Sequence, residues 1–129
     1  MKLMDDFFKV LESSGSVTGF ITTVALDPGH IVYKGHFPGH PVTPGVIQMQ
    51  IVHELLEHHF GRKLSLISMP SCKFLKVLDP RETPQLVVHV EFTRTDDLLN
   101  IKARGENGST VFFKLNGTYL CNNPKVLNV

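Results

Sequence analysis

Residues 35–46 read GHFPGHPVTPGV, and this stretch separates a β-rich region from a long amphipathic segment. Residues 35–45 contain three prolines and three glycines, a density that excludes regular helix or strand. A flexible linker would be polar, whereas this stretch contains Phe37 and Val42. We therefore interpret it as a rigid loop of special shape, and such loops on a scaffold often carry function.

A long helix is predicted directly after this loop. Thr43 can act as its N-cap with Pro44 at the first helical position, and Gly61 can end it after Phe60. Because Val46 and Ile47 are apolar, we expect the N-terminal half of the helix to be buried nearly all round. At about 100° per residue, one face collects Met49, Ile51, Val52, Leu55, Leu56 and Phe60, and the opposite stripe collects Gln50, His53, Glu54, Glu57 and His58.

The rest of the chain is predicted to be mainly β. Apolar spacing in residues 4–11 indicates a short docking helix, and the breaker run 13–16 follows it. An Asn107-Gly108 pair is typical of a hairpin turn. One helix followed by four strands indicates an α+β fold, an antiparallel sheet wrapped around a long central helix. The predicted strands are 17–26, 31–33, 64–78, 85–95, 98–105 and 111–121.

The composition limits the classes of protein to which the chain can belong. The chain has 129 residues, 42% of them apolar, which suits a single domain (1–129) with one core. The chain has thirteen basic and twelve acidic residues, so it lacks the excess of positive charge that is typical of nucleic-acid-binding proteins. No apolar run approaches the roughly 18 residues of a membrane span, and acidic residues occupy the place of a signal peptide's apolar stretch. We expect a cytoplasmic protein without a membrane partner, and we expect Cys72 and Cys121 to be buried free thiols.

His36 is the first candidate for chemistry. It lies in the proline-braced loop just before the helix, whose first free amides belong to Gly45 and Val46. Those N–H groups and the helix dipole can stabilise a developing oxyanion, and a nearby histidine can act as a general base at neutral pH.

The loop and the helix start resemble a known enzyme family. The run from Gly35 to Val46 is similar to the active-site segment of the hot-dog 3-hydroxyacyl-acyl-carrier-protein dehydratases, which carry His-Phe-Pro-Gly and Pro-Val-x-Pro-Gly before a central helix. Residues 73–80, KFLKVLDP, look like the strand that follows this helix. The resemblance covers roughly residues 16–121 in element order and implies the hot-dog fold.

The resemblance also implies roles for single residues. His36 matches the catalytic histidine, oriented by the Val42 carbonyl, and it would remove the α-proton of a 3-hydroxyacyl thioester. The amides of Gly45 and Val46 match the groups that bind the thioester carbonyl, and a trans-2-enoyl thioester remains after water leaves. The substrate would be linked to acyl carrier protein or coenzyme A, the site would lie in a homodimer interface, and no cofactor or metal is implied.

The helix departs from the family at two positions. The family has a carboxylate five residues after the Pro-Gly glycine, usually in a Glu-x-x-x-Gln pattern, whereas this chain has Gln50 and then Glu54. A carboxamide cannot donate a proton at ordinary pH, and loss of a general acid costs on the order of 10²–10⁴ in rate. Glu54 could be a displaced acid or simply face solvent. Alternatively, His36 shuttles the proton alone, or activity is lost.

Several further residues could contribute. Gln48, early in a buried helix, needs a polar partner and is predicted to be structural. His53 and Glu57 have metal-ligand spacing but lack a third ligand, so no metal site is predicted. Basic residues including Lys34 and Lys76 could meet an acidic carrier protein or simply be solubilising charge. An acyl tunnel could be lined by Phe37, Ile47, Met49 and Phe74, although core packing explains such residues equally well.

Two other functions stay open at this point. A subunit that has lost turnover could bind acyl carrier protein or a partner dehydratase, and Gln50 motivates this alternative. An acyl thioesterase on the same fold would need a carboxylate to activate water, and only Glu54 is placed for that role.

Overall fold

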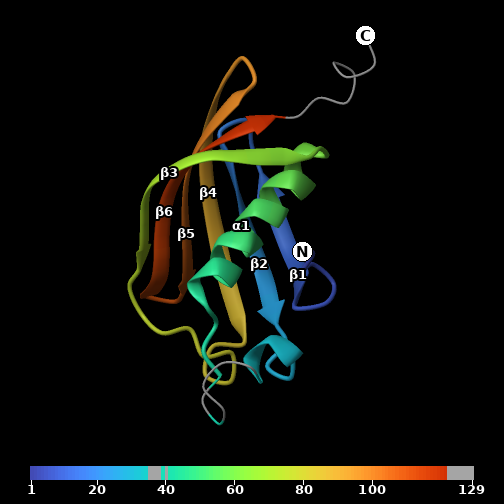
Figure 1. The fold of residues 1–129 in the computed structure, drawn as a ribbon, viewed down its shortest axis with the longest axis vertical. Helices are drawn as coiled ribbons and strands as arrows, with labels where there is room; N and C mark the ends of the chain where they lie inside the picture. Colours follow the sequence, from blue (N-terminus) through green and yellow to red (C-terminus); the bar gives the residue numbers. More distant parts are fainter. Residues whose placement is uncertain (35–38, 40, 122–129) are drawn as a thin grey trace.

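A computed structural model describes residues 1–34, 39 and 41–121. One sheet contains six antiparallel strands in the order β1-β2-β4-β5-β6-β3, and the helix α1 (Gly45–Phe60) lies against the face around which the strands curve (Figure 1). The strands are β1 (Phe8–Gly15), β2 (Gly19–Leu26), β3 (Leu64–Phe74), β4 (Gln85–Thr95), β5 (Leu98–Asn107) and β6 (Thr110–Cys121). The predicted α+β arrangement is therefore confirmed.

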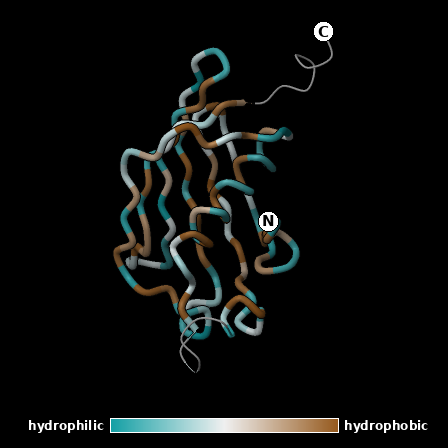
Figure 2. Tube along the Cα trace, viewed as in Figure 1, coloured by the Kyte–Doolittle hydropathy of each residue, from teal (hydrophilic) through white to brown (hydrophobic). Residues whose placement is uncertain are grey.

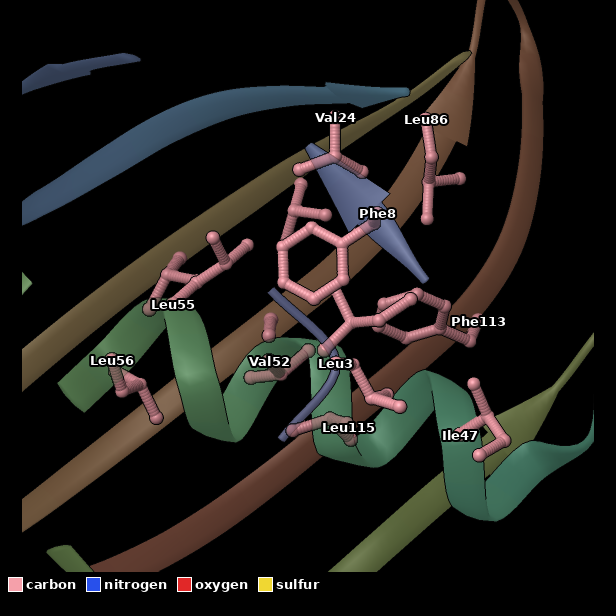
Figure 3. Packing of buried hydrophobic residues seen from close by; sticks show 14 of the residues in the cluster. Leu3, Phe8, Val24, Ile47, Val52, Leu55, Leu56, Leu86, Phe113 and Leu115 are labelled. Carbon is pink, nitrogen blue, oxygen red and sulfur yellow. The ribbon is translucent and has the colours of Figure 1, made fainter. Parts of the chain in front are cut away.

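The core forms where the helix meets the sheet. Buried and exposed positions alternate along β4, β5 and β6, which places one face of each strand against α1. Hydrophobic and hydrophilic residues are correspondingly interspersed along the strands (Figure 2). Val52 and Leu55 of the helix pack in one cluster with Phe8 and Val24 of the sheet (Figure 3). Each such side chain contributes about 1.5–3 kcal/mol when fully buried, so the apolar face of α1 fixes its position.

Both ends of the helix are set by backbone chemistry. Gly61 adopts a left-handed conformation with φ 65° and ends the helix after Phe60, as predicted. At the other end the N-cap is Pro44, one residue later than predicted, and it makes no side-chain cap hydrogen bond. The Thr43 hydroxyl is instead paired with the hydroxyl of Tyr33 at 2.9 Å.

The predicted N-terminal helix is wrong. The chain makes a turn in which Asp5 has φ 67°, and it then enters β1, where Phe8 pairs with Leu26. The breaker residues 13–15 belong to the same strand. The apolar spacing in residues 4–11 suited a helix locally, but hydrogen bonding to β2 outweighs that preference.

Three smaller predictions are also corrected. Residues Ile31–Tyr33 form a short 3₁₀ helix, η1, rather than a strand, because the His30 side chain caps it by accepting from the Val32 N–H. The strand predicted to reach residue 78 ends at Phe74. Val46 is 63% exposed, so the first turns of α1 are not buried all round in the single chain.

The bounds of one strand and the position of one hairpin turn agree with the prediction. The strand over residues 85–95 has the predicted bounds, and Gly108 adopts φ 58° in the predicted hairpin turn. Both cysteines are free thiols as predicted, but only Cys121 is buried as expected, because Cys72 is half-buried. In the described part of the chain, no helix has the length and apolar character needed to cross a membrane.

Candidate functional site

The start of α1 presents two backbone donors. The N–H groups of Ile47 and Gln48 both donate to the Pro44 carbonyl, at 3.0 and 3.1 Å. The N–H groups of Gly45 and Val46 lie before this pattern and have no acceptor among the described residues. The first turn contains no acidic side chain, so the positive end of the helix dipole is not offset there. This site can stabilise a developing negative charge.

A groove of about 380 Å³ lies beside these donors. It brings together several residues that the sequence singled out, among them Val42, Gly45 and Phe74. The loop that follows β3 forms its other wall. The full lining is Val42, Thr43, Pro44, Gly45, Gln48, Phe74, Leu75, Lys76, Val77 and Leu78.

Phe74 lies directly over the helix start. A Cβ atom at Gly45 would be 2.6 Å from Cε2 and Cζ of the Phe74 ring. Only glycine leaves room for the ring in its present position, and the ring itself is 47% exposed. The contact therefore fixes the shape of the groove next to the Gly45 N–H.

Gln48 faces the groove from the helix. Its Nε2 donates to the Thr43 carbonyl at 2.9 Å, whereas its buried Oε1 has no partner in the described structure. The predicted structural role is thus met on the nitrogen side only. Unpaired buried acceptors are uncommon in folded proteins, so this oxygen is free to accept a hydrogen bond from a donor in the groove.

Two of the predicted tunnel residues lie elsewhere. Ile47 is in the core at 4% exposure, and Met49 is half-buried against the same cluster. Neither lines the groove, unlike Phe74. His36 and Phe37 are outside the described residues, so their predicted roles stay predictions.

Glu54 and Gln50 form a buried polar cluster on α1. Glu54 is only 7% exposed, so the alternative in which it faces solvent is wrong. Its carboxylate accepts from the Leu3 N–H at 2.9 and 2.8 Å and from the Met4 N–H at 2.8 Å. Gln50 Nε2 donates to Glu54 Oε2 at 2.8 Å and to the Met1 carbonyl at 2.9 Å. Gln50 and Glu54 are therefore hydrogen-bonded to each other and to the N-terminal residues.

The other polar residues of the helix have structural partners. His53 Nε2 lies 3.3 Å from Glu57 Oε2, and the same oxygen accepts from the Leu64 N–H at 2.9 Å, where β3 begins. Across the described residues, no three His, Cys, Asp or Glu side chains gather as a metal site would require.

Sequence reasoning missed two contacts near the loop. Tyr33 and Thr43 join their hydroxyls, and burial raises the pKa of Tyr33 to about 12, so its hydroxyl is neutral at working pH. His30 Nε2 lies 3.0 Å from Asp6 Oδ2. Neither pair has a sequence signal, because the partners are far apart in the chain.

The fold and this helix start define a class of protein. A single antiparallel sheet curved around a central helix is the hot-dog architecture, which this chain shares with solved hot-dog proteins. A chain of the dehydratase heterocomplex ApeI:P from Xenorhabdus doucetiae matches at a TM-score of 0.70, with 20% identity over 88% of this chain and 97% of that one. A hypothetical thioesterase with coenzyme A from Streptococcus pneumoniae matches at 0.64, with 10% identity over 93% of this chain and 92% of that one.

The family follows from the sequence matches. The family model for ApeI-like proteins, described as ApeI dehydratase, matches residues 12–111, and the chain belongs to this family. The 3-hydroxyacyl-[acyl-carrier-protein] dehydratase FabZ of Lactobacillus helveticus is 29% identical over 100 residues, which cover 72% of this chain and 67% of that enzyme. FabZ of Latilactobacillus sakei is 33% identical over 67 residues, covering 46% of this chain and 48% of that enzyme.

Proposed function

We propose that the protein dehydrates a 3-hydroxyacyl thioester to a trans-2-enoyl thioester. The observation that carries this proposal is the pair of N–H groups at Gly45 and Val46 at the start of the helix in a dehydratase-family chain, where Gly45 lines a groove. These donors suit a thioester carbonyl that gains enolate charge in the transition state.

The chemistry is a β-elimination. His36 takes the α-proton as general base, and the electron pair of that C–H bond forms the new C–C double bond. The bond between carbon 3 and its hydroxyl oxygen then breaks. A proton returned by the His36 imidazolium converts the leaving hydroxide to water, so the histidine ends in its starting state.

The substrate proposal is an acyl chain on a phosphopantetheine arm of acyl carrier protein or coenzyme A. The FabZ relatives are acyl-carrier-protein dehydratases, which favours the protein-bound form. Lys76 on the groove wall offers a positive charge to an acidic carrier protein or to a nucleotide phosphate.

We also propose that the active form is a homodimer. β3 lies at one edge of the sheet and has exposed Leu66, Ile67 and Phe74, at 44%, 56% and 47%. Val46 on the helix is exposed as well. An apolar edge strand of this kind is a liability in a monomer, whereas a second copy would cover it.

The test is an enoyl-thioester assay on the purified protein. With a 3-hydroxyacyl thioester as substrate, we expect product from the wild type and a fall on the order of 10²–10⁴ for His36→Ala. His40→Ala is the matched control, because it changes a histidine of the same loop that the resemblance does not assign to catalysis. Equal rates for wild type and His36→Ala would remove His36 from the mechanism.

A second function is favoured by the Gln50–Glu54 cluster. Gln50 has no acidic proton, and the Glu54 oxygens already accept from N–H donors. We therefore retain a second proposal, in which the protein is a subunit that binds acyl carrier protein or a partner dehydratase without turnover. Gln50→Glu separates the two functions, because a silent subunit gains activity when a carboxyl group returns to position 50, whereas an enzyme that relies on His36 alone changes little.

A further inference from the structure

The N-terminal arm, defined here as residues 1–7, contacts the site region in two places. The first is the middle of α1, where the Leu3 and Met4 N–H groups donate to Glu54 and the Met1 carbonyl accepts from Gln50. All these bonds are 2.8–2.9 Å long, and the carboxylate is buried. Hydrogen bonds to a carboxylate acceptor are stronger than bonds between neutral groups, so this attachment is strong.

The second contact is at His30, the residue directly before η1. Asp6 Oδ2 lies 3.0 Å from His30 Nε2, and His30 Nδ1 accepts from the Val32 N–H at 3.1 Å. Because Nδ1 is an acceptor, the neutral ring carries its proton on Nε2 and donates it to Asp6. The Phe7 ring also packs on His30, with centroids 5.3 Å apart.

A compact turn joins the two contacts. The N–H groups of Asp6 and Phe7 donate to the Leu3 carbonyl at 3.0 and 2.7 Å, and Leu3 and Phe7 are both buried. The arm thus connects the helix to η1, from which the chain continues into the His36 segment.

The contacts at Glu54 also bear on its role. Each bond made by its oxygens uses a lone pair to accept an N–H. To donate a proton, Glu54 would have to be protonated, and its O–H would then face the same N–H donors. The carboxylate is arranged as an acceptor for the arm.

From these contacts we propose that the N-terminal arm sets the position of α1 relative to η1, with Glu54 as a positioning residue rather than the proton donor. This inference rests on the proposed dehydration. It assigns the exchanged Gln50–Glu54 pair a function in attaching the arm.

The first test measures the arm directly and needs no turnover. Amide hydrogen exchange is followed in the full chain for wild type, Glu54→Ala and the exposed-site control Glu91→Ala. We expect the Leu3 and Met4 amides to exchange at least tenfold faster in Glu54→Ala, with faster exchange also in residues 30–34. Unchanged protection at residues 3 and 4 would overturn the proposal.

The second test separates positioning from acid catalysis. Leu3→Pro removes a donor to Glu54 without touching the carboxylate, and Leu3→Met keeps that donor as the matched control. If the arm positions the site, Leu3→Pro and Glu54→Ala each lower kcat on the order of 10- to 100-fold, and the double variant falls no further. The pH profile of kcat keeps its shape in all of them.

An acid role for Glu54 gives a different result. Leu3→Pro would then leave kcat close to that of Leu3→Met, whereas Glu54→Ala and Glu54→Gln would both lose the alkaline limb of the profile. That outcome overturns the positioning role. If Leu3→Pro fails to fold, Asp6→Asn tests the same arm at its His30 end, and an unchanged kcat there counts against the proposal. A wild type that forms no enoyl product refutes the dehydration alone, since hydrogen exchange still tests the arm.

Discussion

The hydroxyls of Tyr33 and Thr43 are 2.9 Å apart in the protein interior, and they join the chain on either side of residues 34–42. Thr43 is held further by its N–H, which donates to the Leu78 carbonyl at 2.9 Å. The segment that contains His36 therefore begins and ends at fixed points. Fixed ends lower the conformational entropy that the connection between them can have in the folded state.

Replacing Tyr33 by Phe should loosen this closure. The buried Thr43 hydroxyl loses its partner, and we expect a loss of about 1–3 kcal/mol in the free energy of unfolding, measured by urea denaturation. Thr43→Val should cost a similar amount. The double variant should cost clearly less than the sum, since both changes break the same bond, and simple additivity would contradict the pairing.

Gly45→Ala should damage the groove more than the fold. The added methyl group displaces the Phe74 ring, which is half exposed and can rotate, so we expect stability to change by less than about 1 kcal/mol. The rate of dehydration at low substrate should fall on the order of 10- to 100-fold, because the ring moves next to the Gly45 N–H.

Two variants check that interpretation of Gly45. Gly45→Ala combined with Phe74→Ala should recover part of the lost kcat/KM, since the displaced ring is gone. Gly105→Ala is the structural contrast, because its Cβ would overlap the buried ring of Phe113. That variant should lose about 1–3 kcal/mol of stability. A Gly45→Ala protein as active as wild type would contradict the role of this contact.

Gln50→Glu should make stability depend on pH. The new carboxylate would face Glu54 Oε2, which now accepts from Gln50 at 2.8 Å. Two carboxylates at this distance share a proton, so one pKa of the pair rises above its unfolded value. The bound proton stabilises the folded state at low pH and is lost as pH rises. We therefore expect the variant to be weakened relative to wild type more at pH 8 than at pH 5, and Gln50→Met serves as the uncharged control.

His59 should make the protein less stable in mild acid. Its ring stacks on Phe20 with centroids 4.7 Å apart, and partial desolvation of the ring, followed by the charge of His58, lowers the pKa of His59 below its usual value. The unfolded chain therefore takes up the proton more readily, and this contribution to stability is present above about pH 6.5 and lost as pH falls.

Replacement of His59 by Phe should remove that loss. The difference in unfolding free energy between His59→Phe and wild type should grow in favour of the variant from pH 7.5 to pH 5, as measured by chemical denaturation. His58→Gln should keep most of the wild-type pH dependence, because desolvation is the larger cause. A constant difference across this range would show that His59 is not the group responsible.

Local patterns in the sequence predicted most of the scaffold. The helix end at Gly61, the turn at Gly108 and the bounds of β4 each follow from a single residue or a short periodic run. The start of the helix was predicted to within one residue, and the groove brings together Gly45, Val42 and Phe74 from the predicted set.

The errors arose where distant segments meet. Residues 4–11 satisfy helical spacing, yet β2 provides the hydrogen bonds that make them a turn and a strand. The burial of Glu54 depends on the backbone of Leu3, 51 positions away, and no periodicity in the helix reveals it. Likewise, the Thr43 hydroxyl fits a helix cap by local rules, but Tyr33 competes for it.

The attachment at Glu54 uses main-chain N–H groups that every residue except proline possesses. Side chains at positions 3 and 4 can therefore change widely through mutation while the carboxylate keeps its donors, provided that Leu3's apolar packing is replaced by something similar. A comparison of relatives that scores only residue identity would overlook this contact. Relatives that retain the contact should have a carboxylate at helix position 54 and no proline at positions 3 and 4.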